Sequence, residues 1–338
     1  MLLVLSDSHD PVVGRVSDEL TRRGAPFAVL NPALGAVGDE LRCALGPRGS
    51  RVRAGGRAID LDAVAQVWLW RPGLPYGREG APAARFGDAT VGAYAEADWI
   101  GVLGDALHAR PRRWLPGPPA TLRRADAKLG QLALATALGL AVPETLVTND
   151  VDEALAFIDA HHGDVIMKPP SVNLTVQLAA KGMVAYTRTI KPRDLAAIDA
   201  VVHVPVMLQR KIVKQVELRV TVVGDRVFPA EIHSQVTRRT RVDWRRYDHA
   251  HTPVREHALP DEVAARCRAL AHRLGLRYGA IDLVLTPDGE YVFLEINPNG
   301  QWTWIEDLTG LPITAALCDE LLRPEFRAAV ERDRPFWQ

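Results

Sequence analysis

Two short β-rich runs late in the chain, residues 281–285 and 291–296, restrict the fold more than any other segment. A Pro-Asp-Gly turn separates them, which is the pattern of two paired strands in a hairpin. Asp282 and Glu295 interrupt these otherwise apolar runs, and Asn297 follows Glu295 by two positions. Because positions two apart on a strand share a face, Glu295 and Asn297 can point the same way, close to Asp282 if the strands pair.

Two carboxylates and an amide oxygen at the end of a sheet form a set of hard oxygen ligands. Mg²⁺ uses such groups when phosphate oxygens and water complete its shell. The alternative is a pair of exposed acids on a half-buried hairpin, which is the commoner fate of two acidic residues. The apolar neighbours on both sides and the Asn-Pro-Asn-Gly loop that follows favour the metal site.

The composition is that of an ordinary globular chain, and its 338 residues fit two or three α/β units. Lys plus Arg number 41, as do Asp plus Glu, so no overall field favours nucleic acid or an anionic membrane. The three cysteines are scattered without metal spacing, which predicts a reducing cytoplasm and no disulfide framework. No segment has the pattern of a signal peptide or of a membrane span.

The first part of the chain opens with a β-α-β pattern. Residues 2–5 and 27–30 are expected as buried strands on either side of a helix over 12–23, which indicates a small parallel-sheet domain. Asp-x-His at residues 7–9 resembles the first metal motif of binuclear metallophosphoesterases, but their later ligand loops do not occur, so plain strand-end polarity is favoured. The Pro- and Arg-rich residues 110–119 predict a linker and the first domain boundary.

The middle of the chain places two lysines at the ends of predicted elements. A helix is expected over residues 125–140, with Lys128 near its start, and a strand over 165–170 contains Lys168. A lysine that closes a buried strand points toward the sheet edge where α/β proteins bind ligands, and its ammonium is a compact phosphate-binding charge.

Residues 217–227 are expected to form two strands around a Gly-Asp turn. Glu217 and Arg219 share a face of the first strand. An arginine on an apolar strand needs a partner. A structural ion pair would serve, but an anionic ligand suits the guanidinium fork better.

A basic stretch with interleaved aromatic residues spans residues 238–247. Nucleic acid is one interpretation, but a neutral chain with a single short basic patch gives it little support. The histidines His249 and His251 are expected at the surface. Further helices are expected over 259–274 and 312–322, followed by a loosely packed tail.

The late hairpin also carries a resemblance to a known family. Asp282, Glu295 and Asn297, in IDLVLT and FLEINPNG, resemble the magnesium-binding end of the ATP-grasp ligases. The run NGQWTWIEDLTGLPI resembles the graspetide (microviridin-type) maturases, which close rings in ribosomal peptides. The resemblance implies an α/β chain with α+β elements: an ATP-grasp fold with an N-terminal Rossmann-like pre-ATP-grasp domain.

The resemblance covers about residues 114–322 well and the first domain only in outline. It implies four segments: an N-terminal domain (1–115), a central ATP-grasp subdomain (116–207), a C-terminal subdomain with the Mg²⁺ site (208–325), and a tail (326–338). The family carries a Gly-rich phosphate flap after its second lysine. In this chain residues 171–187 contain no glycine before Gly182, so that segment is instead expected as a hairpin that receives a peptide.

The resemblance also implies a role for each residue that matches the family's pattern. Metal ligands are Asp282, Glu295 and Asn297. ATP-binding residues are Lys128, Lys168, Gln209, Lys211, Ile212 and Glu217, with Gln209 and the Lys211–Ile212 backbone at the adenine and Glu217 at the ribose. Catalytic residues are Lys168, Arg219 and Arg245. Substrate-binding residues are Arg219, Arg241, Asp243 and Arg245.

The function implied is an ATP- and Mg²⁺-dependent ligase that phosphorylates Asp or Glu side chains of a precursor peptide and closes ester or amide rings. The partner is a peptide with a leader and an acidic core, without nucleic acid or membrane, and dimers are common among the apparent relatives, so a homodimer is considered. The first alternative is a ligase that adds an amino acid or small amine to a carboxylate. The second alternative is a nucleotide- or peptide-binding protein without catalysis.

Overall fold

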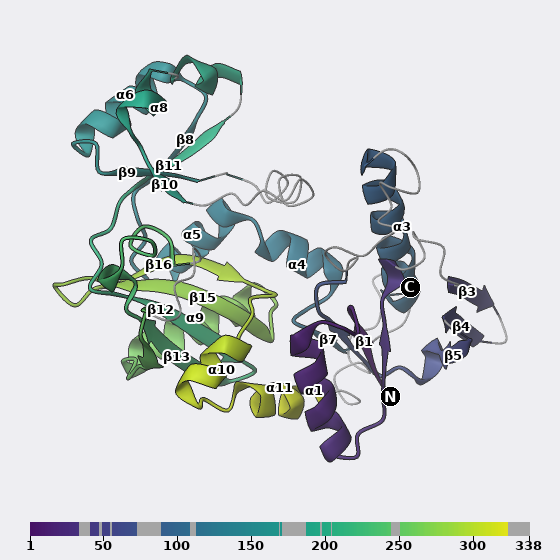
Figure 1. Cartoon of the computed structure of the whole chain (residues 1–338). Helices are drawn as coiled ribbons and strands as arrows, with labels where there is room; N and C mark the ends of the chain where they lie inside the picture. Colours follow the sequence, from purple (N-terminus) through teal and green to yellow (C-terminus); the bar gives the residue numbers. More distant parts are fainter. Residues whose placement is uncertain are drawn as a thin grey trace.

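The structure is a computed structural model, and Figure 1 shows the whole chain. It describes residues 1–33, 41–46, 49–54, 56–72, 89–108, 113–168, 170, 187–196, 198–203, 205–244 and 251–323. The expected hairpin over 171–187, the tail and Arg245 therefore lie wholly or largely outside the described residues.

The chain opens with a parallel four-stranded sheet in the order β2-β1-β6-β7. Its elements are β1 (Leu2–Leu5), α1 (Pro11–Arg22), β2 (Phe27–Leu30), β6 (Gln66–Leu69) and β7 (Arg113–Leu115). The side chain of Asp10 caps α1 by accepting a 2.8 Å hydrogen bond from the Val12 amide. The β-α-β opening is therefore confirmed, whereas the Rossmann-like assignment of this domain stays a prediction.

Both faces of this first sheet are covered because its strands are apolar on both sides. One face packs on α3 (Ala89–His108), and the other packs on α1 and on α11 (Ile313–Leu321), which comes from the end of the chain. A separate antiparallel sheet lies beside it. That sheet consists of β3 (Leu41–Gly46), β4 (Gly49–Ala54) and β5 (Arg57–Asp60), followed by the short helix η2 (Leu61–Ala63).

The segment expected as a linker is partly a strand. Arg113–Leu115 forms β7 and pairs in parallel with β6, and Trp114 and Leu115 are buried. Two large apolar side chains bring this segment into the core despite the turn residues around it. The described part of the linker therefore belongs to the first sheet up to Leu115.

A second, four-stranded sheet forms an upper lobe in Figure 1, in the order β10-β9-β11-β8. Its strands are β8 (Thr145–Thr148), β9 (Val165–Lys168), β10 (Arg188–Thr189) and β11 (Val206–Arg210). Its helices are α6 (Val151–Ala160), α8 (Pro192–Leu195) and η3 (Ile198–His203). We call residues 145–210 the upper lobe.

The remaining sheet, which we call the central sheet, is antiparallel and five-stranded, in the order β14-β13-β12-β15-β16. Its strands are β12 (Val216–Val223), β13 (Arg226–Ile232), β14 (Val254–Glu256), β15 (Tyr278–Leu285) and β16 (Tyr291–Asn297). The short helix η4 (Ser234–Val236) follows β13. The predicted hairpin is confirmed as β15 and β16. After Ile232 the chain leaves β13 and turns into η4.

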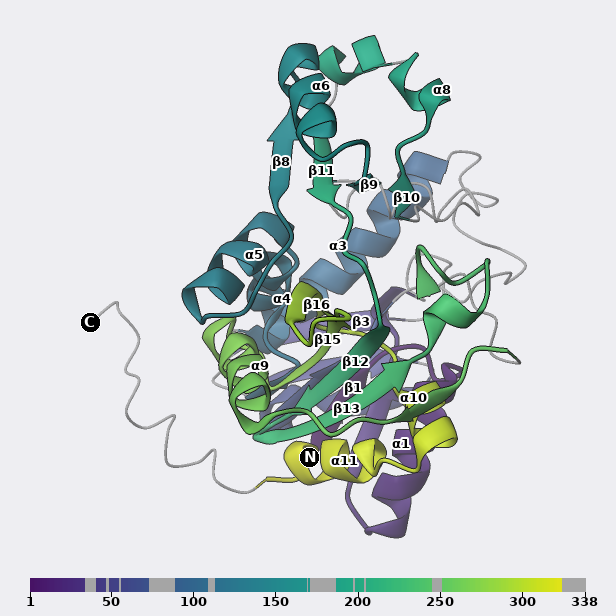
Figure 2. The same cartoon turned by 90° about the vertical axis from the view of Figure 1, so that its left-hand side faces the viewer.

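The two faces of this sheet are used differently (Figure 2). The face with Leu218 and Val220 packs on α9 (Asp261–Arg273) and on α5 (Lys128–Ala137). The other face carries the polar residues Glu217 and Arg219. It is covered at one end by α10 (Thr303–Thr309) and α11.

The helix expected over 125–140 is two helices, α4 (Pro119–Ala125) and α5. The chain is extended at Ala127, where ψ is 97°, so Lys128 becomes the first residue of α5. In a continuous helix the Ala125 carbonyl would accept from the backbone four residues on. Here it accepts a 2.6 Å hydrogen bond from the side-chain amide (Nε2) of Gln131, and this bond replaces the backbone bond.

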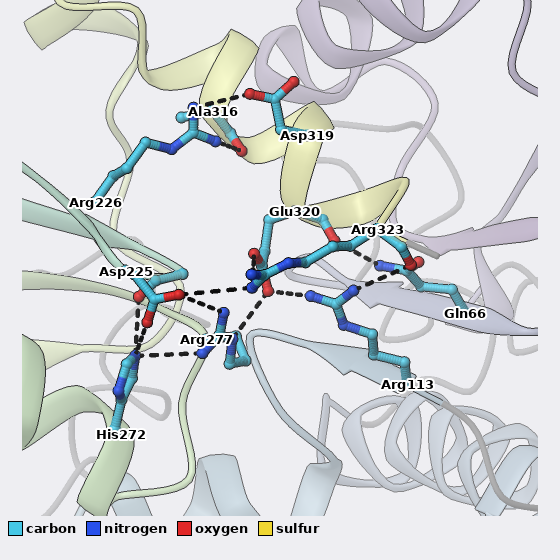
Figure 3. Close-up of polar contacts among 11 residues, drawn as sticks. Gln66, Arg113, Asp225, Arg226, His272, Arg277, Ala316, Asp319, Glu320 and Arg323 are labelled. Atoms are coloured by element: carbon cyan, nitrogen blue, oxygen red, sulfur yellow. Dashed lines mark hydrogen bonds and ion pairs between the residues drawn. The ribbon is translucent and has the colours of Figure 1, made fainter. Parts of the chain in front are cut away.

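A polar network ties the first sheet to the central sheet (Figure 3). At its centre is Glu320 of α11, which is only 5% exposed. Its carboxylate bonds to Arg113 of β7 and to Nε of Arg277 at 2.9 Å, and Arg323 lies at 3.5 Å. Asp225, in the β12–β13 turn, completes the network through Arg277 and Arg323.

An aromatic cluster makes a second connection between the two sheets. Trp70 directly follows β6, and its ring lies 4.9 Å from that of Trp302 and 5.9 Å from that of Tyr278, measured between centroids. Aromatic pairs at such distances each contribute about 0.5–1.5 kcal/mol beyond area burial. The loop after β16 is thus fixed to the first sheet.

None of the helices in the described part of the chain combines the length and the apolar character needed to cross a bilayer. The three cysteines, Cys43, Cys267 and Cys318, are free thiols.

Candidate active site

A cavity of about 260 Å³ lies where the upper lobe meets the central sheet. Its walls come from β9, the segment after β11, β12, β15, β16 and the loop after β13. It brings together eight of the predicted site residues: Lys168, Lys211, Ile212, Glu217, Arg241, Asp243, Asp282 and Glu295. Four other described residues with predicted roles are not among its walls: Lys128, Gln209, Arg219 and Asn297.

The two predicted metal carboxylates face each other across the hairpin. Asp282 of β15 pairs in register with Glu295 of β16, and both line the cavity. A β-bulge follows at this point, where Leu294 and Glu295 together oppose Asp282. Consecutive side chains of a regular strand face opposite ways, but the bulge lets Leu294 and Glu295 both line the cavity. With this sequence, an unbulged strand would turn Glu295 away.

The third predicted ligand, Asn297, stands opposite Ala280 at the end of β16 and is exposed. Its Oδ1 accepts a 2.9 Å hydrogen bond from the Asn299 amide, which shapes the following loop. The described residues contain no group of three His, Cys, Asp or Glu side chains placed to hold a metal. A metal here would therefore rest on two carboxylates, with further oxygen ligands from Asn297, substrate or water.

Arg219 is held in a buried ion pair. Its Nη1 donates a 2.8 Å hydrogen bond to Asp282, its cross-strand neighbour. Its guanidinium lies 5.6 Å from the ring centroid of Trp244, within cation–π range. Burial lowers the pKa of Arg219, but the Asp282 carboxylate more than offsets this, so the pKa is raised overall. Of the two partners weighed from the sequence, the structure shows the ion pair.

Gly300 makes room for Arg219. A Cβ atom at Gly300 would lie 2.4 Å from Nη2 of Arg219 and 2.4 Å from the Cβ of Ala280. Any larger residue would push the guanidinium away from Asp282. The glycine of the Asn-Pro-Asn-Gly loop thus has a packing role beside the carboxylate pair.

Glu217 is a buried acid, 4% exposed, at the wall of the cavity. Its Oε1 accepts a 2.8 Å hydrogen bond from Nζ of Lys214, whereas Oε2 is buried without a hydrogen bond from the described residues, near the Ser234 hydroxyl. Burial raises the pKa of the Glu217 carboxyl, and Lys214 opposes the rise. A buried acceptor of this kind suits a hydroxyl donor from a ligand, such as a ribose.

The two predicted phosphate lysines lie in different places. Lys168 closes β9 and lines the cavity, as the strand-end prediction requires. Lys128 begins α5, outside the cavity walls. It still lies in the electrostatic surroundings of Asp126, whose pKa is raised by burial and by the negative charge of Glu295, and is lowered by Lys128. Lys128 and Glu295 therefore both lie close to Asp126.

The predicted adenine residues are only partly at the cavity. Lys211 and Ile212 line it, but the Lys211 amide already donates to the Asp164 carbonyl at 2.8 Å. Gln209 is fully buried inside the upper lobe, where its amide nitrogen donates to the Thr145 hydroxyl at 2.9 Å. A direct adenine contact by the Gln209 side chain stays a prediction that this geometry does not favour.

The predicted substrate-binding loop is partly described. Arg241 and Asp243 line the cavity. Asp243 is 4% exposed and accepts a 3.1 Å hydrogen bond from the Thr187 amide, so it ties the loop to the start of β10. Arg245 lies outside the described residues.

Sequence reasoning missed three residues that shape the site. Lys214 lines the cavity and binds Glu217, and its position three residues before that acid was an available signal. Trp244 covers Arg219 and lies 5.1 Å from Trp304, measured between ring centroids. Gln131 gave no sequence signal, because its partners are backbone groups far along the chain.

The arrangement can hold a polyanion and its counter-ions. Asp282 and Glu295, whose carboxylates suit a divalent cation, lie on one wall, and Lys168 lies on another. A half-enclosed cavity with charged groups of both signs on its walls suits a nucleotide next to a transfer centre.

No protein-family model matches the sequence, and no curated protein matches it. Solved structures do. The macrocyclase MdnC from Microcystis aeruginosa, bound with precursor peptide MdnA, matches with a TM-score of 0.78 at 26% identity, covering 95% of this chain and 98% of that chain. A RiPP-associated ATP-grasp ligase from Chryseobacterium gregarium, in complex with ADP and a leader and core peptide, matches with a TM-score of 0.80 at 26% identity, covering 95% and 96%.

The macrocyclase MdnB from Microcystis aeruginosa matches with a TM-score of 0.71 at 28% identity, covering 95% of this chain and 99% of that chain. All three matches span nearly the whole length of both proteins. The likeness therefore spans 95% of this chain and is not limited to the hairpin.

Proposed function

We propose that this chain is an ATP-grasp ligase of the graspetide-maturase type, which closes rings in a ribosomal precursor peptide. The acids joined are Asp or Glu side chains, and the groups they join are hydroxyls or amines of the same peptide. The relatives described above include macrocyclases and an enzyme in complex with ADP, a leader and a core peptide. The substrates proposed are therefore ATP and a precursor with a leader and an acidic core.

The observation that carries this proposal is the meeting of Lys168, Glu217, Asp282 and Glu295 in one cavity. They come from four strands of two sheets, and the cavity lies at the junction of those sheets. Fold stability alone does not explain why two acids, a lysine and a buried acceptor from distant segments meet in one cavity.

The acid pair fits Mg²⁺. Asp282 and Glu295 supply carboxylate oxygens at one wall, and Asn297 follows with an amide oxygen. A bound Mg²⁺ would neutralise charge on the ATP phosphates and on the phosphoryl group in transfer. Arg219, paired to Asp282, orients that carboxylate and adds positive charge behind it.

The chemistry follows from the groups at hand. A free carboxylate is a poor acyl donor because an oxide would have to leave. Transfer of the ATP γ-phosphoryl group to the acid makes a mixed anhydride and releases ADP. A peptide hydroxyl or amine then attacks the carbonyl carbon, and phosphate leaves with its electron pair. Lys168 would stabilise the charge that develops on the transferring phosphoryl.

The remaining assignments are part of the same proposal. The domain limits are 1–115, 116–207, 208–325 and 326–338, the compartment is the cytoplasm, and a homodimer is compatible with the function. Glu217 would accept from the ribose, and Lys128 would reach the phosphates from the start of α5. Arg241 and Arg245 would receive the acidic core.

The test is mass spectrometry of a short acidic precursor co-expressed with the enzyme. Ring closure removes one water per ring, so the peptide mass falls, whereas addition of an amino acid or amine raises it. A mass decrease that requires the active enzyme supports the proposal. An increase would establish the intermolecular ligase instead, and an unchanged mass with every tested precursor would support a protein that only binds.

A further inference from the structure

A second cavity, of about 200 Å³, lies beside the nucleotide cavity. Five of its lining side chains are cationic, and we call them the cationic pocket: Arg188, Lys191, Arg193, Arg238 and Arg239. Among the described residues its only lining acid is Asp194, which is already engaged by Arg188 at 2.6 Å and by the Lys191 amide at 2.9 Å. The pocket thus keeps a strong excess of positive charge.

This excess is local. The chain carries 41 basic and 41 acidic residues, so a cavity with five cations against one acid is a departure from its average. Within the described residues, no hydrogen bond or ion pair joins Arg238 or Arg239 to an acid. Like charges brought together repel one another, so the arrangement stabilises an anion more than it stabilises the fold.

The pocket joins two parts of the molecule. Arg188 of β10, Lys191 just before α8 and Arg193 of α8 belong to the upper lobe, whereas Arg238 and Arg239 lie on the loop after β13. Val242 lines both this pocket and the nucleotide cavity, and Arg241 lines the nucleotide cavity. A ligand in the pocket would therefore lie directly next to the reacting groups.

We propose that the cationic pocket binds a second carboxylate of the precursor, on the same peptide as the acid that is being activated. This rests on the proposed function, and it is separate from the substrate roles of Arg219, Arg241 and Arg245. A peptide is the occupant that the surroundings favour, because the pocket shares Val242 with the cavity where peptide acids would react. Among the described residues, no aromatic side chain lines the pocket for stacking a base, so a nucleic acid fits it less well.

The consequence is a preference among substrates. A precursor with several acids would be held at two points, one acid in the nucleotide cavity and one in the cationic pocket. A peptide with a single acid would lose one of these contacts. The pocket would thus select acid-rich cores and help to fix which acid reacts.

The experiment measures direct binding of a short fluorescein-labelled peptide of alternating Glu and Thr to the full chain with an ATP analogue and Mg²⁺. The matched peptide replaces Glu by Gln. The variants are Arg238→Ser with Arg239→Ser, and separately Arg193→Ser on the upper lobe. The control is Arg51→Ser with Arg53→Ser, two exposed arginines of β4 far along the chain from the pocket.

The double variant is expected to bind the Glu peptide about fivefold to tenfold more weakly, as the loss of two exposed charge pairs implies. Arg193→Ser should also weaken binding, and the control should match the wild type. The difference in affinity between the wild type and the double variant should shrink at high salt. Equal affinity of wild type and double variant would overturn the proposal. So would competition by inorganic phosphate as strong as that by the Glu peptide, or tighter binding of a single-stranded RNA of similar length.

Binding of the ATP analogue separates this inference from the proposed function. The double variant should keep wild-type affinity for the analogue, because the pocket is outside the nucleotide cavity. If the wild type releases ADP with a precursor but the pocket variants bind the Glu peptide normally, only the inference fails. If the pocket variants lose peptide affinity while no precursor changes mass, only the proposed reaction fails.

Discussion

At the scale of single residues, the site depends on side chains that hold strand β16 in place. Gln131 of α5 is 3% exposed, and its side-chain amide bonds to both backbone polar groups of Ile296. Its Nε2 donates to the Ile296 carbonyl at 2.9 Å, and its Oε1 accepts from the Ile296 amide at 3.0 Å. Ile296 lies between Glu295 and Asn297, so one amide side chain fixes the backbone that carries both predicted ligands.

Gln131→Met is therefore expected to raise the Mg²⁺ concentration needed for half-maximal ADP release several-fold. It should also lower the free energy of unfolding by about 1–3 kcal/mol, because buried backbone groups lose partners. The KM for the precursor should stay unchanged, since the peptide side of the cavity is intact. A steady-state titration with Mg²⁺ measures this split.

The control is Leu134→Ala, which removes packing from the same helix and leaves the hydrogen bonds between Gln131 and Ile296 in place. It should lower stability while leaving the Mg²⁺ requirement unchanged. If Gln131→Met lost stability but needed no more Mg²⁺ than the wild type, Gln131 would be a structural residue only.

The sequence predicted the main residue pair of the site for a physical reason. Hairpin pairing is a local rule, and it placed Asp282 and Glu295 close together across the two strands, whereas a regular two-residue period would have put them on opposite faces. The bulge at Leu294 was not predictable, because it depends on how the strands fit the cavity around them. The Arg219–Asp282 ion pair was foreseen as one alternative, but choosing it required knowledge of the neighbouring strand.

At the scale of secondary-structure elements, α1 and α11 lie side by side although they come from opposite ends of the chain. Glu19 of α1 accepts hydrogen bonds from Arg22 and from Arg23, and Arg23 continues to Asp319 of α11 at 2.6 Å. These hydrogen bonds lower the pKa of Glu19 to about 2. The charged carboxylate thus supports the helix contact.

Glu19 is expected to make the free energy of unfolding depend on pH. Because the folded pKa of Glu19 lies below its usual value of 4.5, its contribution is complete above that value and is lost as pH falls toward about 2. Urea unfolding at about pH 7 and at about pH 3 measures it. Glu19→Gln should lose less stability between these two conditions than the wild type does.

Asp18→Asn, which changes an exposed acid of the same helix, is the matched control and should follow the wild type. An identical loss in the wild type and Glu19→Gln would show that this carboxylate does not contribute to acid sensitivity.

Most elements were predictable because their periodicity is local, but three differences have clear causes. The break between α4 and α5 comes from a side chain, Gln131, that replaces a backbone hydrogen bond. Strand β7 forms because Trp114 and Leu115 are buried against the first sheet. The short helix α10 was missed because its residues carry little helical periodicity, and its end at Gly310 (φ 76°) is the clearest signal of it.

At the scale of the whole molecule, the network around Glu320 connects segments that are far apart in the sequence (Figure 3). Glu320 and Arg113 are 207 residues apart, and both side chains are buried, at 5% and 11% exposure. No rule for local sequence could have paired them. Long-range charge pairs of this kind are the part of the fold that sequence reasoning could not supply.

Glu320→Gln should lower the free energy of unfolding by about 2–4 kcal/mol, because Arg113, whose side chain is 11% exposed, would lose its counter-ion. Asp319→Asn, on the next residue, removes a half-exposed partner of Arg226 and should cost only about 0–1 kcal/mol. Urea unfolding of the two variants measures the difference. Equal and small losses would mean that the network does not hold the two sheets together.

The proposed reaction depends on the hairpin carboxylates holding Mg²⁺ against the ATP phosphates. The most direct measurement is ADP release, with ATP, Mg²⁺ and precursor, by Glu295→Gln and by Glu290→Gln, which changes an exposed acid of the same hairpin. We expect Glu295→Gln to lose about a hundredfold or more in rate, and Glu290→Gln to stay near the wild type. Near-normal ADP release by Glu295→Gln would contradict the metal assignment and the mechanism built on it.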